Sequence, residues 1–285
     1  MKLKLGLIGN AISKSRAPSL HRFLGNIHGI EISYDLLDPG TSDANALVQK
    51  IEQLIRERYD GCNITFPFKQ LALDFADLPD KASALVGSTN TLKLGTQIKA
   101  TNTDYTGFVR AFIQRFDVDS RGTTLILGAG GVGRAIAFGL GHVCRERIHI
   151  FDPSTARSEE LCSALQSAGF DARSIVQSEI PEVSQQVTGI LNCSPVGHYQ
   201  TPGTPIDLSL IGNQKWAFDA VYTPIKTSFI ESCWQSNIAV LSGFDLFFYQ
   251  GLDAFEYWTG IKANEHEVKR AFLSESKINP AEILN

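Results

Sequence analysis

The residues best suited to chemistry begin with a run of glycines near the middle of the chain. Gly128, Gly130 and Gly133 have the spacing G-x-G-x-x-G, directly after the apolar run TTLILG and before RAIAFGLG. In a strand–helix turn the first glycine permits a tight turn, the second lets the backbone approach a pyrophosphate, and the third allows close packing. The helix N-terminus would face the anion, although glycine-rich turns also occur for packing alone. The predicted dinucleotide-binding turn comprises Gly128, Ala129, Gly130, Gly131, Val132 and Gly133.

An acidic residue after the next apolar run bears on the choice of dinucleotide. Asp152 follows RIHIF and lies 19 residues past Gly133, where a carboxylate can accept hydrogen bonds from the adenosine ribose. A carboxylate there repels a 2′-phosphate, and Pro153 has no charge to attract one. Arg157 is the only nearby cation, and it is also interpreted as a solvated helix residue. Asp152 and Arg157 are therefore predicted cofactor residues, and NAD is favoured over NADP.

Hydride transfer to a ketone also needs a proton donor beside the carbonyl oxygen. With no histidine in a telling motif, the best candidates are Lys69, in NITFPFK, and Asp104, in ATNTDYTGF. A lysine side chain has an ordinary pKa of about 10.4, which burial lowers and an adjacent carboxylate raises. Each residue also has a structural interpretation: Lys69 as a surface lysine, and Asp104 as the N-cap of a helix over 105–116.

The elements that position these residues begin with two β-α pairs. A strand is predicted over 3–9, and Pro18 is placed in the first turn of the helix that follows. Ser42 is predicted to cap a second helix. The apolar positions with helical spacing are Leu20, Phe23, Leu24 and Ile27 in the first helix and Leu47, Ile51, Leu54 and Ile55 in the second.

The candidate lysine follows the third predicted strand. This strand covers 62–66, and Pro67 is predicted to open the helix that carries Lys69. Polar and apolar residues then alternate over 90–101 about Gly95, which predicts a hairpin. The first third of the chain should therefore form a sheet with at least one antiparallel pair.

Beyond residue 104 the pattern changes to a tight alternation of strands and helices. One helix is predicted over 155–168 and a last, aromatic-rich helix over 244–258. Strands separated by helices predict a parallel sheet with right-handed crossovers. The strands are predicted over 123–128, 147–151, 189–193 and 215–221.

The length and pattern predict two α/β domains with a cleft between them. The chain has 285 residues, which favours about two domains. We expect a mixed-sheet α/β substrate domain formed by residues 1–103 and 240–285. A Rossmann-type dinucleotide-binding domain would cover 104–239.

The overall composition is that of a soluble globular protein. A formal net charge of −4 leaves no basic surface for nucleic acid, and no apolar run approaches the ~20 residues of a membrane helix. The beginning, MKLKLGLIGNAISKS, reads as a strand rather than a signal peptide. The cysteines are odd in number and scattered, which favours reduced thiols in a cytoplasmic protein. No metal site is expected. The cysteines are Cys62, Cys144, Cys162, Cys193 and Cys233.

Taken together, these segments resemble the shikimate/quinate dehydrogenase family over nearly the whole chain and in the family's order. GLIGNAISKSRAPSLH resembles the substrate-carboxylate loop, NITFPFK the catalytic-lysine motif, and GSTNTL and NTDYTGF the asparagine and aspartate motifs. GAGGVGRA resembles the glycine-rich turn. LNCSPVG and DAVYTPIKTSFI resemble the later cofactor-side strands, and GFDLFFYQGLDAFEYWTG the closing helix.

The resemblance implies hydride transfer between a nicotinamide cofactor and a ring hydroxyl or ketone of shikimate, quinate or a close relative. Lys69 would exchange a proton with the reacting oxygen, and Asp104 would orient Lys69 and bind the substrate. Asp-Pro-Ser at 152–154 is the pattern of the NAD-using branch, although NADP stays possible. The other substrate-binding residues implied are Ser15, Thr65, Asn90, Tyr222 and Gln250. The other cofactor-binding residues implied are Asn192, Ser194, Val221 and Gly243.

Two positions depart from the family pattern. The carboxylate loop normally has two hydroxyl residues, but here it reads Ser15-Arg16-Ala17. Losing one charge-assisted hydrogen bond costs about 1.5–3 kcal/mol, or ~10- to 150-fold in affinity. Either Lys14 or Arg16 replaces the hydroxyl or the natural substrate differs, and Arg16 is also interpreted as an exposed loop charge. His198 stands where methionine is common, either at the nicotinamide edge or as a loop residue without a role.

Other interpretations remain. Tyr222 to Lys226 matches the Y-x-x-x-K of short-chain dehydrogenases, but that chemistry needs a helix, which Pro224 disfavours. The same scaffold could reduce an aminoshikimate-type acid. A protein of another class, a sensor that binds the acid and the nucleotide without catalysis, is disfavoured because Lys69 and Asp104 are both present. The expected partner is a small cyclic hydroxy acid, and monomer and homodimer both stay open.

Overall fold

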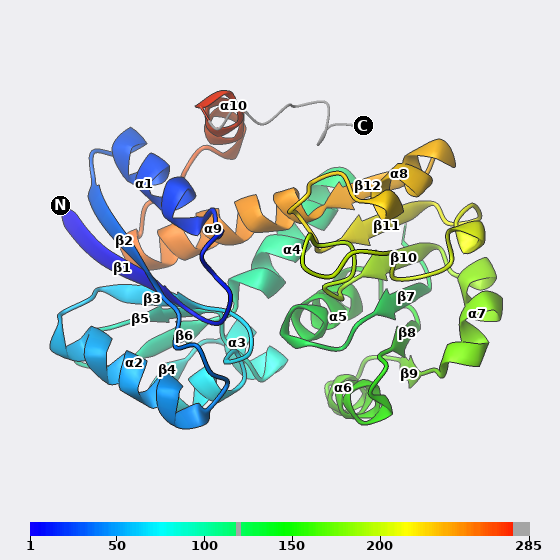
Figure 1. Ribbon diagram of the computed structural model, residues 1–285, viewed down its shortest axis with the longest axis horizontal. Coiled ribbons are helices and arrows are strands. Elements are labelled where there is room, and N and C mark those ends of the chain that lie inside the picture. Colours follow the sequence, from blue (N-terminus) through cyan, green and yellow to red (C-terminus); the bar gives the residue numbers. More distant parts are fainter. Residues whose placement is uncertain (118–120, 276–285) are drawn as a thin grey trace. The chain divides into compact units, whose positions relative to one another are not determined.

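The computed structural model describes residues 1–117 and 121–275, which form two compact units (Figure 1). Unit 1 contains Met1–Gly107 and the described chain from Phe248 onward, and unit 2 contains Phe108–Phe247. The chain passes from one unit to the other within two helices, α4 (Thr103–Arg115) and α9 (Gly243–Thr259). Within the described residues, no helix is long and apolar enough to cross a membrane.

Unit 1 is built on a six-stranded mixed sheet with the order β2-β1-β3-β5-β6-β4. Strand β1 is parallel to β2 and β3, whereas β5 is antiparallel to both β3 and β6. The predicted mixed sheet and its hairpin are therefore confirmed. The strands are β1 (Lys2–Ile8), β2 (Glu31–Leu37), β3 (Gly61–Ile64), β4 (Leu78–Pro79), β5 (Thr91–Lys93) and β6 (Lys99–Thr101).

Helices α1 (Ala17–Ile27) and α2 (Ala44–Arg56) lie on opposite sides of this sheet (Figure 1). Both bury an apolar face because their apolar residues recur at helical spacing. Ile27 and Ile55, at the last turns of these faces, are instead 47% and 50% exposed. The buried positions are Leu20, Phe23 and Leu24 in α1 and Leu47, Ile51 and Leu54 in α2. Unit 1 also contains α3 (Lys81–Val86) and α10 (Glu265–Glu275).

The cap of α2 differs from the expectation. Asp43, not Ser42, is the N-cap: its backbone is extended and its Oδ1 accepts a hydrogen bond from Asn45 N at 3.0 Å. The hydroxyl of Ser42 accepts from Asn10 Nδ2 at 3.1 Å instead. Serine and aspartate are both good caps, and the prediction fails because the loop places Ser42 one residue too early.

The segment that carries Lys69 is also not the predicted helix. Strand β3 ends before Thr65, and Phe68 N donates to Thr65 O at 3.0 Å, which closes a turn around Pro67. Lys69 therefore lies in a turn, ahead of the short 3₁₀ helix η1 (Leu71–Phe75). The prediction is wrong because proline at a turn and proline at a helix start look alike in sequence.

Unit 2 contains a six-stranded sheet in which every pair is parallel, with the order β12-β11-β10-β7-β8-β9. Counted along the chain this is the order 3-2-1-4-5-6 of dinucleotide-binding sheets, which confirms the predicted Rossmann-type fold. The strands are β7 (Thr124–Leu127), β8 (Ile148–Phe151), β9 (Ala172–Ser174), β10 (Gly189–Asn192), β11 (Trp216–Asp219) and β12 (Ala239–Ser242).

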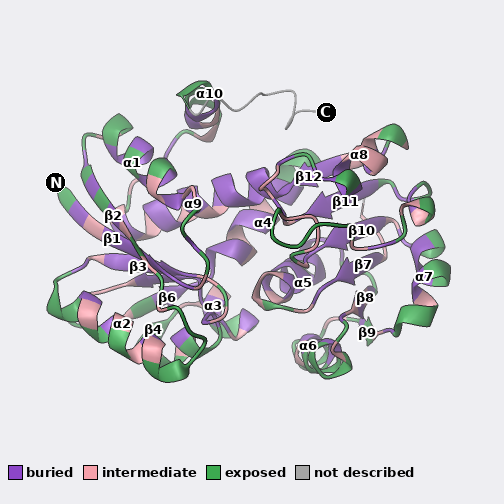
Figure 2. Ribbon diagram, viewed as in Figure 1, coloured by how far each residue is buried: buried purple, intermediate pink, exposed green. Residues whose placement is uncertain are grey.

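An apolar cluster covers one face of the second sheet. In this cluster Leu125 and Ile190 pack with Val183 of α7 and Phe229 of α8. Figure 2 shows the central strands β10 and β11 buried and the outer side of α6 exposed. All five cysteines are buried and free of disulfide bonds, as predicted. The helices are α5 (Gly131–Val143), α6 (Thr155–Ser167), α7 (Ile180–Gln186) and α8 (Ser228–Gln235).

A buried histidine in unit 1 makes the stability of the fold depend on pH. His21 is 0% exposed, stacks on Tyr34 with centroids 5.1 Å apart, and meets Trp258 edge-on at 5.0 Å. Burial lowers the pKa of His21 from 6.5 to about 3. The unfolded chain therefore takes up a proton below pH 6.5 that the folded protein excludes. This histidine's stabilising effect is present above that pH and is lost as pH falls.

We expect wild-type stability to fall by about 1.4 kcal/mol per pH unit below pH 6.5 from this residue, or about 2 kcal/mol by pH 5. His21→Phe keeps an aromatic ring against Tyr34 and Trp258 but cannot titrate. Urea unfolding of both proteins at pH 7.5 and 5 measures the difference. Equal losses in the two proteins would show that His21 is not the titrating group.

Candidate active site

The candidate lysine and aspartate, 35 positions apart, form a buried ion pair in unit 1. Lys69 Nζ lies 2.5 Å from Asp104 Oδ2, and the two residues are 7% and 6% exposed. Lys69 is therefore not a surface lysine. Asp104 is not the helix cap either, because Asn102 Oδ1 accepts the hydrogen bond from Tyr105 N at 3.1 Å. The carboxylate of Asp104 is left to bind the ammonium.

Strand pairing brings this pair together. Strands β3 and β5 are antiparallel with Asn63 opposite Thr91, so the chain after β3 lies beside the chain before β5. Lys69 O accepts from Thr89 N at 2.8 Å at this point. Strands β5 and β6 are antiparallel with Thr91 opposite Thr101, so the chain before β5 also lies beside the start of α4. Both charged residues are thereby placed at one edge of the sheet.

Asn90 and Gln250 join the same edge through Thr103, the first residue of α4. Asn90 Oδ1 accepts from Thr103 N at 2.7 Å, and Asn90 Nδ2 donates to Thr103 Oγ1 at 2.9 Å. Thr103 Oγ1 donates to Gln250 Oε1 at 3.4 Å. Gly107 permits this approach, because a Cβ there would lie 2.5 Å from Gln250 N. Thr103, which sequence analysis does not single out, therefore links the two polar residues beside Asp104.

A buried asparagine supports this network from behind. Asn63 Nδ2 donates to Asn90 O at 3.2 Å and to Thr91 Oγ1 at 3.0 Å. Its Oδ1 accepts from Tyr34 Oη at 2.7 Å. Asn63 is 6% exposed, and buried polar groups persist only with such partners. The only sequence signal for this role is a polar residue inside the otherwise apolar strand β3.

Ser15 and Thr65 lie on the loops that follow β1 and β3 at this edge. Gly9 lets the two loops meet, because a Cβ there would be 2.2 Å from Thr65 Cγ2. Ser15 Oγ accepts from Ala17 N at 3.3 Å. Among the described residues Ser15 forms no hydrogen bond with Lys69 or Asp104, so it lies in the same region without bonding to the pair.

The glycine turn of unit 2 has the geometry that its sequence predicts. Gly128 has a φ of +109°, and a Cβ there would lie 2.8 Å from the backbone of Cys193 and Ser194. A Cβ on Gly133 would lie 2.0 Å from Gly128 O, whereas one on Gly130 would meet nothing within 4 Å. The first and third glycines are thus required by the protein's own packing, and the space beside the second is open to a ligand.

This turn lies where nucleotides bind in such sheets. It follows β7, and the loop of Cys193 and Ser194 follows β10. These adjacent strands are the point where the strand order reverses, which is the usual position of the ligand crevice. The residues present therefore fit a dinucleotide.

Asp152 is joined directly to the glycine turn. Its Oδ2 accepts from Ala129 N at 2.8 Å and its Oδ1 from Ser154 N at 2.9 Å. Each carboxylate oxygen has a second lone pair that can accept from a ribose hydroxyl. Arg157 is exposed on the first turn of α6.

Four further residues predicted to approach the cofactor surround a carboxylate that the sequence analysis does not identify. Asp219 ends β11 and accepts hydrogen bonds from Asn192 Nδ2 at 2.9 Å and Val221 N at 3.0 Å. Asn192 in turn accepts from Ser194 Oγ at 2.7 Å. A Cβ on Gly243 would lie 2.8 Å from Asp219 O. A charged residue at the end of the apolar strand WAFD is the sequence signal for this group.

Two remaining candidates lie in loops of unit 2. Tyr222 stacks on Phe247 with centroids 5.2 Å apart, in the loop between β11 and α8. The segment from Tyr222 to Lys226 is not helical, as expected from Pro224. His198 Nδ1 accepts from Gln200 N at 3.1 Å within its own turn.

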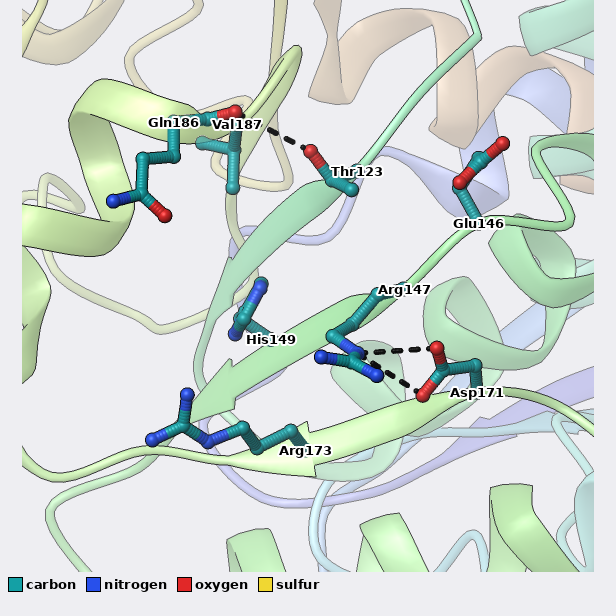
Figure 3. Close-up of a pocket in the computed structure, with 8 residues that line it drawn as sticks. All are labelled: Thr123, Glu146, Arg147, His149, Asp171, Arg173, Gln186 and Val187. Atoms are coloured by element: carbon teal, nitrogen blue, oxygen red, sulfur yellow. Dashed lines mark hydrogen bonds and ion pairs between the residues drawn. The ribbon is translucent and has the colours of Figure 1, made fainter.

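A separate hollow of about 430 Å³ lies at the opposite ends of the unit 2 strands (Figure 3). Thr123, Arg147 and Asp171 each directly precede a strand there, whereas ligands of parallel sheets bind at the carboxyl ends. Arg147 Nε pairs with Asp171 at 3.1 Å, and Arg173 pairs with Glu179. The positive charges are thus balanced by neighbouring carboxylates, and the hollow is not the candidate site.

Comparison with known proteins agrees with the fold of both units. The model of the "Shikimate dehydrogenase substrate binding domain" matches residues 7–92, and that of the "Shikimate 5′-dehydrogenase C-terminal domain" matches residues 243–271. A quinate/shikimate dehydrogenase (NAD(+)) of Corynebacterium efficiens is 32% identical, covering 95% of this chain and 97% of that protein. A shikimate dehydrogenase (NADP(+)) of Arthrobacter is 31% identical, with 94% of each covered.

A solved structure is similar over the whole length. Quinate dehydrogenase from Corynebacterium glutamicum in complex with NAD matches with a TM-score of 0.85 at 28% identity, covering 96% of this chain and 99% of that chain. Because relatives named for NAD(+) and for NADP(+) are almost equally similar, the comparisons alone do not select the nucleotide.

Proposed function

The chain belongs to the shikimate/quinate dehydrogenase family, and from this premise we propose that it oxidises or reduces a ring position of shikimate, quinate or a close relative with NAD. The observation that carries the proposal is the buried pair of Lys69 and Asp104, whose Nζ and Oδ2 lie 2.5 Å apart. A buried charged pair costs desolvation energy and is often found at functional sites.

In this proposal Lys69 moves the proton. When bound, the nicotinamide ring accepts or supplies the hydride. As a neutral amine, Lys69 Nζ takes the proton of the ring hydroxyl during oxidation and becomes an ammonium. During reduction the ammonium gives a proton to the ketone oxygen and becomes the amine, so Lys69 acts as general base and general acid. Asp104 holds Nζ in position and accepts a hydrogen bond from the substrate.

The remaining residues bind the ring and its carboxylate. Asn90 and Gln250 are proposed to bind ring hydroxyls, and their link through Thr103 supports this. Thr65 would bind a further ring hydroxyl, Tyr222 would line the site, and the carboxylate would bind at the Ser15 loop. Ala17 in that loop supports a second candidate substrate, an aminoshikimate-type acid.

The nucleotide is proposed to bind at the glycine turn of unit 2. Open space beside Gly130 and the first-turn N–H groups of α5 would accept the pyrophosphate. Asp152 supports NAD over NADP, because its carboxylate can bind the ribose hydroxyls and repels a 2′-phosphate. Asn192, Ser194, Val221 and Gly243 would complete the cofactor site.

The proposal is tested by mixing the purified protein with each nucleotide and each acid and following NADH or NADPH absorbance. We expect turnover with NAD and quinate or shikimate. Turnover only with an amino analogue would favour the second substrate. A flat trace with every pair, in a protein that still binds both ligands, would instead identify a non-catalytic sensor.

Replacing Asp152 tests the cofactor assignment. We expect Asp152→Ala to lower kcat/KM for NAD about tenfold or more, as expected for a lost hydrogen bond to a charged group, and to lower it much less for NADP. Asp152→Asn keeps an acceptor for Ala129 N. It therefore tests the effect of the negative charge without removing the hydrogen bond that holds the turn. Glu159→Ala, an exposed acid on α6, is the matched control. Unchanged discrimination in both Asp152 variants would exclude Asp152 from the cofactor site.

A further inference from the structure

A buried carboxylate in unit 2 has no role in the chemistry proposed above. Asp219 is 0% exposed and lies at the carboxyl end of β11. Its Oδ1 accepts from Asn192 Nδ2 at 2.9 Å and from Val221 N at 3.0 Å, and its Oδ2 accepts from Thr227 Oγ1 at 2.6 Å. No described lysine, arginine or histidine forms a salt bridge with it. Hydrogen-bond donors alone therefore stabilise this charge.

The first of these donors connects Asp219 to the glycine turn. Asn192 also donates to Val196 O at 2.9 Å, and its Oδ1 accepts from Ser194 N at 3.1 Å, so its side chain sets the loop after β10. The backbone of that loop at Ser194 lies against Gly128, where a Cβ would be 2.8 Å away. The position of the loop at the turn thus depends on the side chain that Asp219 holds.

The same carboxylate organises the loop after β11, and the start of α9 packs against that loop. Val221 N donates to the carboxylate directly, which turns the chain immediately after β11. The backbone after β12 rests on the same turn, because a Cβ on Gly243 would lie 2.6 Å from Ala220 O and 2.8 Å from Asp219 O. Asn192 and Val221 therefore bond to Asp219, Ser194 bonds to Asn192, and Gly243 packs against the backbone of Asp219 and Ala220.

The charge of this group changes in an accessible pH range. Burial raises the pKa of Asp219 from 3.8 to about 6, and the hydrogen bonds from Thr227, Val221 and Asn192 oppose that rise. The titratable groups facing it in the described chain are the thiols of Cys193 and Cys233. Burial and the charge of Asp219 raise the pKa of both thiols, so both stay neutral. Protonation places a hydrogen on one oxygen, which makes that oxygen a poorer acceptor, and it removes the negative charge that strengthens all three hydrogen bonds.

We propose that Asp219 is a positioning residue for the dinucleotide. Its ionised carboxylate holds the loops after β10 and β11, and with them the start of α9 that follows β12, in their binding arrangement, and its protonation loosens that arrangement and lowers cofactor affinity. The inference rests on the proposed function in one respect: the dinucleotide binds at the glycine turn.

The test is NADH affinity, followed by fluorescence of the full chain between pH 8 and pH 5. We expect the wild-type Kd to rise roughly 3- to 10-fold as pH falls through 6, the equivalent of one lost hydrogen bond. Asp219→Asn should bind NADH more weakly by a similar factor at pH 8 and show no further change down to pH 5. Asp207→Asn is the matched control, because Asp207 is an exposed acid of the same unit that caps a short helix.

A second pair of variants keeps the charge and changes one donor. Thr227→Val removes the hydroxyl that donates to Asp219 and should raise the Kd at pH 8, whereas Thr227→Ser keeps the hydroxyl and should bind as the wild type does. Thr227 also caps α8 by accepting from Ile230 N at 3.2 Å, so thermal unfolding of each variant is measured alongside. If Asp219→Asn does not fold, the proposal is tested by the two Thr227 variants and by the pH dependence of NADH affinity in the wild type.

The outcomes separate the two proposals. If the wild-type protein binds no NADH at pH 8, the proposed dinucleotide site itself is overturned. A wild type that binds NADH with a pH profile shared by Asp219→Asn overturns only the role of Asp219. Equal affinities in Thr227→Val and Thr227→Ser would overturn that role as well.

Discussion

Replacing Lys69 with alanine is expected to lower kcat by about 10²- to 10⁴-fold, the usual contribution of a positioned acid–base group. The affinity for NADH should change less than twofold, because Lys69 belongs to unit 1 and the glycine turn to unit 2. Steady-state kinetics with the preferred acid, together with NADH titration, measures both quantities. A kcat within tenfold of the wild type, or an equal loss in NADH binding, would contradict the assigned role.

The stability of this variant needs its own control. Lys69→Ala leaves the buried carboxylate of Asp104 without its cation, which typically costs about 3–5 kcal/mol. The double variant Lys69→Ala with Asp104→Asn removes that charge and should regain most of the stability without regaining kcat. Lys81→Ala, an exposed lysine at the start of α3, should leave kcat and stability unchanged. Recovery of kcat in the double variant would show that the single change acts through folding.

Adding a hydroxyl to the carboxylate loop is expected to have the second largest effect. Ala17 is 8% exposed at the first position of α1, two residues from Ser15. If shikimate or quinate is the substrate, Ala17→Ser should lower its KM by about 10-fold or more, which corresponds to one charge-assisted hydrogen bond. The kcat should change little, because the carboxylate lies away from the reacting oxygen and is bound equally in the ground and transition states.

Two further variants make this result interpretable. Ser19→Ala changes an exposed hydroxyl of the same helix turn and should leave KM unchanged. Arg16→Ala tests the alternative in which Arg16 replaces the missing hydroxyl, and it should raise KM only if Arg16 binds the carboxylate. Within the described chain neither Lys14 nor Arg16 has a carboxylate partner, so both charges are available to a ligand. An unchanged or higher KM in Ala17→Ser would place the carboxylate elsewhere or indicate a different acid.

Local patterns in the sequence determine much of this protein. The roles of Gly128 and Gly133 follow from a turn only a few residues long, and the close packing around both glycines agrees with these roles. The parallel sheet of unit 2 follows from strands separated by helices, because parallel neighbours need a long crossover. The hairpin about Gly95 is equally local. These features depend on residues close together in the chain. Their spacing is visible in the sequence, so they can be predicted from it.

Local ambiguity accounts for the expectations that fail. Ser42 and Asp43 are both acceptable caps, and the choice between them depends on Asn10, which is 32 residues from Ser42. Pro67 is compatible with a helix start and with a turn, and the structure has the turn. By sequence Asp104 is an acceptable cap for α4, but in the structure Asn102 is the cap. In each case two local solutions have similar energies, and distant contacts select one.

Only the tertiary structure decides which distant residues meet. Lys69 and Asp104 form a pair because β5 is antiparallel to both β3 and β6 in one fixed register. A slip of one residue would turn the side chains of a strand to the other face of the sheet. Asp219 acquires one of its three donors for a similar reason, since the pairing of β10 and β11 places Asn192 opposite it, whereas Val221 and Thr227 follow Asp219 closely in the chain. Sequence alone determined the types of element and the residues capable of chemistry, because these depend on short-range spacing. Strand register and burial determined their partners and the charge states that burial shifts, because these depend on contacts between segments far apart in the chain.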